Sequence, residues 1–183
     1  MGVPNETSES DAPAPADHRS GFVTFVGRPN VGKSSLVNAI CDRKISIVSD
    51  KPQTTRHRIM GVLTRPGAQV VFVDTPGLHK PVTALGERVN ATALESTADV
   101  DVTCLVLDAT APFGKGDRWV ADRIDIARSV VIVNKLDIAS REQVLAMLTA
   151  AADLGAAEYF PVSATSGEGI SALVDHLTGL LPD

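Results

Sequence analysis

The sequence predicts an α/β fold in which a mostly parallel sheet carries helices on both faces. Short apolar runs alternate with amphipathic segments along most of the chain, the pattern produced by parallel strands joined through crossover helices. Hydrophobic residues make up 44% of the chain but aromatic residues only 4%. The core must therefore consist of Val, Ile, Leu and Ala, as in strands buried on both faces. A chain of 183 residues suits one domain and is short for two.

The elements follow in order from residue 21. β-branched apolar runs predict the strands, apolar residues at helical spacing predict the helices, and Pro66-Gly67 between two apolar runs predicts a hairpin. The expected strands are 22–26, 44–49, 58–64, 69–74, 101–109, 129–135 and 157–164. The expected helices are 33–42, 84–98, 116–127, 140–155 and 169–181.

Residues 1–20 are acidic and rich in Pro and Ser, so we expect a disordered tail before one domain at 21–183. The net charge of −5 argues against a nucleic-acid module that depends on neutralising phosphates. No apolar run approaches the roughly 20 residues needed to span a bilayer. The expected location is the cytoplasm, with peripheral attachment to a membrane as the alternative.

The segment GRPNVGKS, residues 27–34, matches a phosphate-binding loop between the first expected strand and helix. Gly27 and Gly32 let backbone N–H groups turn toward a phosphate, and the helix N-terminus adds partial positive charge. Lys33 would bridge the β- and γ-phosphate oxygens of a nucleotide, and the Ser34 hydroxyl would bind Mg²⁺. We call residues 27–34 the phosphate loop.

The sequence DTPGLHK begins at Asp74, where another expected strand ends. Asp74 would hold Mg²⁺ through a water molecule, and the Gly77 N–H would meet the γ-phosphate. Many nucleotide hydrolases carry a glutamine after this glycine to orient the attacking water, whereas this chain has Leu78. DTPG alone would be an ordinary turn, but after a phosphate loop it indicates a nucleotide site.

The segments NKLD and SAT each follow an expected strand and indicate which base is bound. The Asp137 carboxylate can accept hydrogen bonds from N1–H and the 2-amino group of guanine. Adenine has no such pair of donors, so the unpaired carboxylate would disfavour ATP. Asn134 would link the loops, the Lys135 stem would lie along the base, and the Ala164 N–H would meet guanine O6. Together they favour GTP over ATP.

These motifs, with KPQTTRH at 51–57, DTPGLHKP at 74–81 and the segment 87–109, resemble the GTPase domain of the Era family of bacterial ribosome-assembly proteins. The resemblance covers residues 21–183. Der- and MnmE-type GTPases share the phosphate-loop and TTR motifs and are the nearest alternative. The resemblance implies a P-loop fold with a six-stranded, mostly parallel sheet, in which Thr55 closes on Mg²⁺ and the γ-phosphate.

The motifs and the resemblance together define the expected site, whose ligand is GTP or GDP with Mg²⁺. The residues expected to bind the nucleotide are Gly27, Asn30, Val31, Gly32, Lys33, Ser34, Ser35, Asp74, Thr75, Pro76, Gly77, Asn134, Lys135, Asp137, Ser163, Ala164 and Thr165. The expected metal ligands are Ser34, Thr55 and Asp74, and the expected catalytic residues are Lys33, Asn30, Thr55 and Gly77.

Era proteins continue into an RNA-binding KH domain, whereas this chain ends just after its last expected helix. We expect a truncated chain rather than a family member that naturally lacks the domain. The resemblance implies the small ribosomal subunit and its RNA as partners of the full-length family, mainly through that KH domain.

Two functions compete. The first is a switch that hydrolyses GTP slowly, and the second is a module that signals by nucleotide occupancy with negligible hydrolysis. Leu78 favours the second. Asn30 favours the first, because in related GTPases with a hydrophobic residue at the glutamine position an asparagine here accompanies a bound K⁺. Such a cation offsets charge developing between the phosphates. Arg28 and Arg56 are alternative charge donors, although a solvated surface position is more usual for such arginines.

Overall fold

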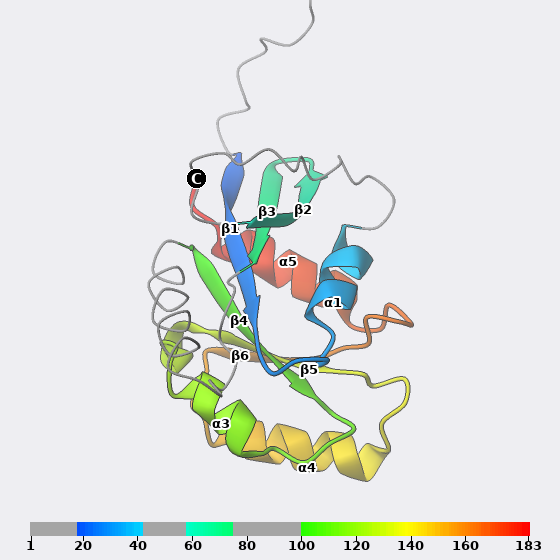
Figure 1. Cartoon of the computed structure of the whole chain (residues 1–183). Coiled ribbons are helices and arrows are strands. Elements are labelled where there is room, and N and C mark those ends of the chain that lie inside the picture. Colours follow the sequence, from blue (N-terminus) through cyan, green and yellow to red (C-terminus); the bar gives the residue numbers. More distant parts are fainter. Residues whose placement is uncertain (1–17, 42–57, 75–99) are drawn as a thin grey trace, which may run out of the picture.

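The computed structural model describes residues 18–41, 58–74 and 100–183 (Figure 1). Within these ranges, six strands form one sheet in the order β2-β3-β1-β4-β5-β6. The strands are β1 (Arg19–Val26), β2 (Arg58–Arg65), β3 (Ala68–Asp74), β4 (Val102–Asp108), β5 (Val130–Asn134) and β6 (Glu158–Pro161). The helices are α1 (Lys33–Ile40), α3 (Lys115–Ala121), α4 (Arg141–Ala152) and α5 (Ile170–Leu180), with a short 3-10 helix, η1, at Ile126–Arg128.

Neighbouring strands run parallel throughout the sheet except for β2 and β3. This antiparallel pair is joined by the predicted hairpin, in which Gly67 has a φ of 75°. Glycine adopts this left-handed conformation without the steric cost of a side chain. The structure confirms the predicted six-stranded, mostly parallel sheet.

Side chains of the central strands alternate between two hydrophobic cores, one on each face of the sheet. On β5, Val130 and Ile132 pack into one core, while Val131 and Val133 pack into the other. Helices α1 and α5 cover the first face, and α3 and α4 cover the second (Figure 1). Because both faces are buried, the strands are continuous apolar runs rather than alternating patterns. The prediction of helices on both faces is confirmed.

The boundary predicted between tail and domain is wrong by two residues. Strand β1 begins at Arg19, so Arg19 and Ser20 belong to the sheet. The Arg19 N–H donates to the Gly67 carbonyl, and its guanidinium pairs with Asp183 at 3.2 Å. These partners are distant in sequence, so local composition does not reveal them. Residues 1–17 lie outside the described part of the chain, as do the expected strand 44–49 and helix 84–98.

Helix α3 ends at Ala121, earlier than the residue 127 that its apolar spacing predicts. The N–H groups of Arg123 and Ile124 bond to carbonyls three residues back, which tightens and ends the helix. Ile124 and Ile126 nevertheless pack against the second core. The apolar spacing therefore continues past the helix because these side chains still face the sheet.

Among the described residues, no helix has the length and apolar character to cross a membrane.

Replacing Leu105 with alanine should destabilise the domain strongly, because this β4 side chain is 0% exposed in the second core. We expect the free energy of unfolding to fall by about 2–5 kcal/mol. Leu145 on α4 is 67% exposed and provides the control, since its truncation removes little buried surface. Urea unfolding of both variants measures the difference. Equal losses would contradict this assignment of the core.

Candidate functional site

Most of the predicted site residues lie in loops at the carboxyl edge of the sheet. The phosphate loop follows β1, Asp74 ends β3, and Asn134 ends β5, while Ser163, Ala164 and Thr165 follow β6. Open parallel sheets bind ligands at this edge. Thr55, Thr75, Pro76 and Gly77 lie outside the described residues.

The backbone of the phosphate loop turns through left-handed conformations before α1 begins. The φ angles are 154° at Gly27, 66° at Asn30 and 102° at Gly32. Lys33 is the first residue of α1, and no side chain caps this helix N-terminus. The first N–H groups of the helix are therefore available to an anion. Ser34 and Ser35, in the first turn, are exposed at the same end.

The Lys33 ammonium is directed back over the phosphate loop. Its Nζ donates to the carbonyl oxygens of Gly27 at 2.9 Å and Arg28 at 2.8 Å. An ammonium has three N–H donors, so one remains for an anion. Burial lowers the pKa of Lys33, and the negative charge of Asp74 partly opposes this effect. An anionic phosphate here would favour the charged form of Lys33.

The carboxamide of Asn134 links three loops. Its Nδ2 donates to the Val31 carbonyl at 3.0 Å, and its Oδ1 accepts from the Ala164 N–H at 3.1 Å. The residue is 2% exposed. The carboxamide therefore sets the spacing between the phosphate loop and the ends of β5 and β6.

Lys135 connects the same loops through its ammonium group. Its Nζ donates to the Asn30 carbonyl at 2.7 Å and to Asp108 Oδ2 at 2.6 Å. Its aliphatic stem thus spans the gap between β5 and the phosphate loop. The backbone of Lys135 has a φ of 73°, a strained conformation for a lysine. These two contacts hold that conformation.

Asp108 was missed by the sequence reasoning, although it ends its apolar strand as Asp74 ends β3. Burial raises the pKa of Asp108, but hydrogen bonds from Lys135 and Thr110 outweigh this and hold the pKa below its usual value. The Thr110 N–H and hydroxyl both donate to Asp108 Oδ1. Asp108 is therefore an ionised anchor for Lys135.

The Asp137 carboxylate is oriented from the β6 side. The Ser163 hydroxyl donates to Asp137 Oδ1 at 2.7 Å, and Ser163 Oγ in turn accepts from the Ser166 N–H at 3.0 Å. Asp137 is exposed. The carboxylate is thus held in place while remaining accessible to a ligand with paired N–H donors.

A hydroxyl and a carboxylate, from Ser34 and Asp74, are the predicted metal ligands among the described residues. Oxygen donors of this kind suit Mg²⁺, which binds one or two protein oxygens together with water and substrate phosphates. Within the described ranges, no cluster of three or more His, Cys, Asp or Glu side chains could hold a metal by itself. The donor set therefore fits Mg²⁺ brought with a nucleotide.

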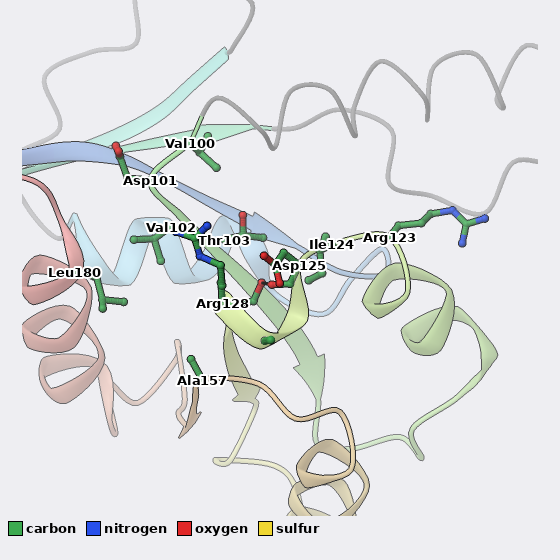
Figure 2. A pocket seen from close by; sticks show the side chains of 12 residues that line it. Val100, Asp101, Val102, Thr103, Arg123, Ile124, Asp125, Arg128, Ala157 and Leu180 are labelled. Atoms are coloured by element: carbon green, nitrogen blue, oxygen red, sulfur yellow. Dashed lines mark hydrogen bonds between the residues drawn. The ribbon is translucent and has the colours of Figure 1, made fainter.

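A cavity of about 680 Å³ lies at the opposite edge of the sheet, near the start of β4 and β5 (Figure 2). Arg128, Thr103 and Asp125 are among its lining residues. It contains none of the predicted site residues, and ligands of open parallel sheets bind at the other edge. The cavity is therefore separate from the candidate site.

Replacing Asp108 with asparagine should lower the free energy of unfolding by about 1–2 kcal/mol at pH 7, because Lys135 then bonds to a neutral amide in place of a carboxylate. The lowered pKa of Asp108 means that its stabilisation is complete above about pH 4, its usual pKa. This stabilisation disappears as the pH falls through the lower folded-state pKa. The difference between wild type and variant should therefore shrink below about pH 4.

Urea unfolding at several pH values measures this difference. Asp125→Asn is the control, because Asp125 is exposed and its carboxylate makes no hydrogen bond to the described residues. A constant Asp108→Asn difference from pH 7 to pH 2.5 would contradict the assignment.

Known proteins similar to this chain identify its family. The chain is 46% identical over 186 residues to the GTPase Era of a Nocardioides species and 45% identical over 186 residues to that of Streptomyces coelicolor. Each match covers 97% of this chain and 59% of the relative. The chain thus spans less than two thirds of the length of these curated relatives.

Solved structures of Era have the same fold. A complex of Era with MgGDPNP and nucleotides 1506-1542 of 16S ribosomal RNA matches with a TM-score of 0.73 and 34% identity, covering 91% of this chain and 58% of that one. A variant of Aquifex aeolicus Era bound to GDP and aluminium fluoride matches with a TM-score of 0.72 and 34% identity, covering 90% of this chain and 58% of that one. These matches confirm the resemblance to Era.

The family model described as 50S ribosome-binding GTPase matches residues 22–135, from β1 through the phosphate loop to the start of NKLD. This match covers more than half of the chain and includes both the loop that would hold phosphate and the first residues that would hold the base. The chain therefore belongs to the 50S ribosome-binding GTPase family.

Proposed function

We propose that this chain is the nucleotide-binding domain of an Era-type protein and that it binds GTP and GDP with Mg²⁺ and hydrolyses GTP slowly. The observation that carries the proposal is the linkage of two loops by Asn134 and Lys135, which bond to the carbonyls of Val31 and Asn30. One loop is built for phosphate and the other for guanine. Their direct connection supports a single site that would take both the phosphates and the base of one nucleotide.

The phosphate end of the site is built for negative charge. The Lys33 ammonium keeps one N–H for the β- and γ-phosphates, and the N–H groups at the start of α1 are uncapped. Mg²⁺ would arrive with the nucleotide and be held by Ser34 and Asp74. There it would neutralise part of the phosphate charge. Thr55 and Gly77 complete the proposed catalytic set from outside the described residues. Thr75 and Pro76 are proposed nucleotide contacts.

The guanine end of the proposed site would accept hydrogen bonds from paired N–H donors of the base. Ser163 holds one oxygen of Asp137, and the carboxylate would accept N1–H and the 2-amino group of guanine. The Ala164 N–H already donates to Asn134, so it would reach guanine O6 only by sharing that hydrogen bond. Thr165 continues this loop. ATP would leave the Asp137 carboxylate without donors, and this loss gives the selectivity.

The alternative is an occupancy switch without hydrolysis of its own, and Leu78 favours it because leucine cannot orient a water molecule. We favour slow hydrolysis with K⁺ bound near Asn30. The left-handed backbone of Asn30 gives a competing reason for asparagine at this position, since Asn tolerates this conformation better than most residues. A test of this role must therefore remove the Asn30 side chain without changing the backbone conformation at this position.

The relatives suggest where such a switch would act. Era has been crystallised with part of 16S ribosomal RNA, and this chain corresponds to somewhat more than half of that protein. We propose that the full-length protein acts in assembly of the small ribosomal subunit, in the cytoplasm or peripherally at the membrane. Since the relatives that share 45% and 46% identity with this chain are Era proteins, a Der- or MnmE-type domain is the weaker alternative.

GTP turnover by this chain should be slow, about 10⁻⁴–10⁻² s⁻¹, and faster in potassium than in sodium buffer. Asn30→Gly should abolish the potassium effect, because glycine keeps the left-handed φ and removes only the side chain. Phosphate release at matched ionic strength measures both rates. No turnover in either salt, with GTP bound, would favour the occupancy switch. A potassium effect that survives in Asn30→Gly would contradict the role of this side chain.

Asp137→Asn should weaken GTP binding at least about tenfold and shift the preference toward xanthosine triphosphate, whose 2-oxo group can accept a hydrogen bond from the new amide. Competition between the two nucleotides in equilibrium binding measures the shift. Asp153 has an exposed carboxylate at the end of α4. The variant Asp153→Asn therefore controls for the loss of one negative charge. Unchanged selectivity in Asp137→Asn would show that another group reads the base.

A further inference from the structure

We propose that Asp117 is a positioning residue for the phosphate loop and that it acts through Arg28, an inference that rests on the nucleotide site proposed above. Arg28 Nε donates to Asp117 Oδ1 at 2.7 Å, and the Asp117 side chain is 1% exposed. The two residues are 89 positions apart. Their ion pair ties the phosphate loop to α3, which lies on the opposite face of the sheet from α1.

The Asp117 carboxylate is itself fixed by the start of α3. Its Oδ2 accepts from the Gly114 N–H at 2.9 Å, closing the first turn of the helix. One oxygen therefore caps the helix while the other holds the guanidinium. A buried carboxylate with both oxygens engaged offers one fixed position to its cationic partner. The orientation of Arg28 thus follows the position of α3.

The residue before Asp117 makes room for the arginine. A Cβ atom on Gly116 would lie 2.6 Å from Arg28 Cδ and 3.2 Å from Cγ. The aliphatic part of Arg28 therefore runs directly over the α3 backbone. Gly116 is the second residue of α3. The close approach of Arg28 leaves no room for a larger side chain at this position unless the arginine moves.

Contacts from other parts of the chain help to hold the backbone of the phosphate loop. Asn30 has a φ of 66°, a left-handed conformation that asparagine tolerates better than most residues but that is uncommon outside glycine. Lys33, Asn134 and Lys135 hold carbonyl groups of the loop. Arg28, itself in the loop, adds a side-chain contact to a separate helix, α3, through Asp117. This role replaces the expectation that Arg28 is a solvated surface arginine.

Gly116→Ala tests the inference without changing any charge. The new methyl group would lie 2.6 Å from Arg28 Cδ, so the arginine must shift relative to Asp117. We expect the affinity for GDP to fall about tenfold, as for other residues that orient a binding group indirectly. Gly179→Ala is the matched control, because Gly179 is also a helical glycine and nothing lies within 4 Å of its added Cβ. Isothermal calorimetry with MgGDP measures both. GDP affinity unchanged in Gly116→Ala would overturn the inference.

A double-mutant cycle separates positioning from general destabilisation. Arg28→Gln and Asp117→Asn should each weaken GDP binding about tenfold, and the double variant should bind no more weakly than the poorer single variant. Thermal unfolding of each variant is recorded in parallel. Independent losses that multiply in the double variant, or lower thermal midpoints with unchanged GDP affinity, would contradict a positioning role.

A measurement on the protein without nucleotide keeps this inference separate from the proposed function. In ¹⁵N-labelled chain, Gly116→Ala should shift the amide signals of Asn30, Val31 and Gly32, whereas Gly179→Ala should leave them in place. If wild type fails to bind GDP, the proposed function is wrong and these shifts alone decide whether Asp117 positions the loop. Unmoved signals in Gly116→Ala would overturn the inference even if GDP binds.

Discussion

The hydrogen bonds of the Asn134 carboxamide are the constraint on which the site depends. This buried amide bonds to the Val31 carbonyl on one side and to the Ala164 N–H on the other. A buried amide without partners is costly, so the three loops are held together by the need to satisfy it. Gly32 lies so close that any side chain there would overlap Asn134 Nδ2. A glycine at position 32 is therefore required by the contact with Asn134 as well as by its own backbone angle.

Three cations of the loop region, Lys33, Lys135 and Arg28, each have partners in a different part of the fold. These partners fix the positions of the charged groups. Lys33 bonds to carbonyls within the phosphate loop, Lys135 bonds to Asp108 at the end of β4, and Arg28 bonds to Asp117 in α3. Each charge already has partners that fix its direction. Such preorganised charges bind an anion without a further cost of reorientation.

The sheet explains why these contacts meet at one edge. The central strands are buried on both faces by two cores, and close-packed interiors resist displacement. The ends of β4 and β5 are consequently held side by side, with Asp108 paired in register with Asn134. Lys135 follows immediately and reaches both Asp108 and the phosphate loop. The loops that follow these strands are thereby held in fixed positions.

Among the described residues, the sequence by itself determined where the helices and strands lie, and it supplied the motifs. Periodicity, glycine placement and strand-end polar residues report local geometry, so the phosphate loop, NKLD and the hairpin at Gly67 could be read directly. The same signals misplaced the end of α3, because Ile124 and Ile126 pack on the core beyond the helix. They also placed Arg19 in a tail, since its partners lie at Gly67 and Asp183.

Only the tertiary structure decided which charged side chains meet. Nothing local joins Arg28 to Asp117 or Lys135 to Asp108, which are 89 and 27 positions apart. Those pairs exist because the strand order brings the ends of β1, β4 and β5 together and sets α3 beside the phosphate loop. An aspartate in a sequence can be a solvated surface group or a buried anchor. Strand order and burial, which are properties of the whole fold, distinguish the two.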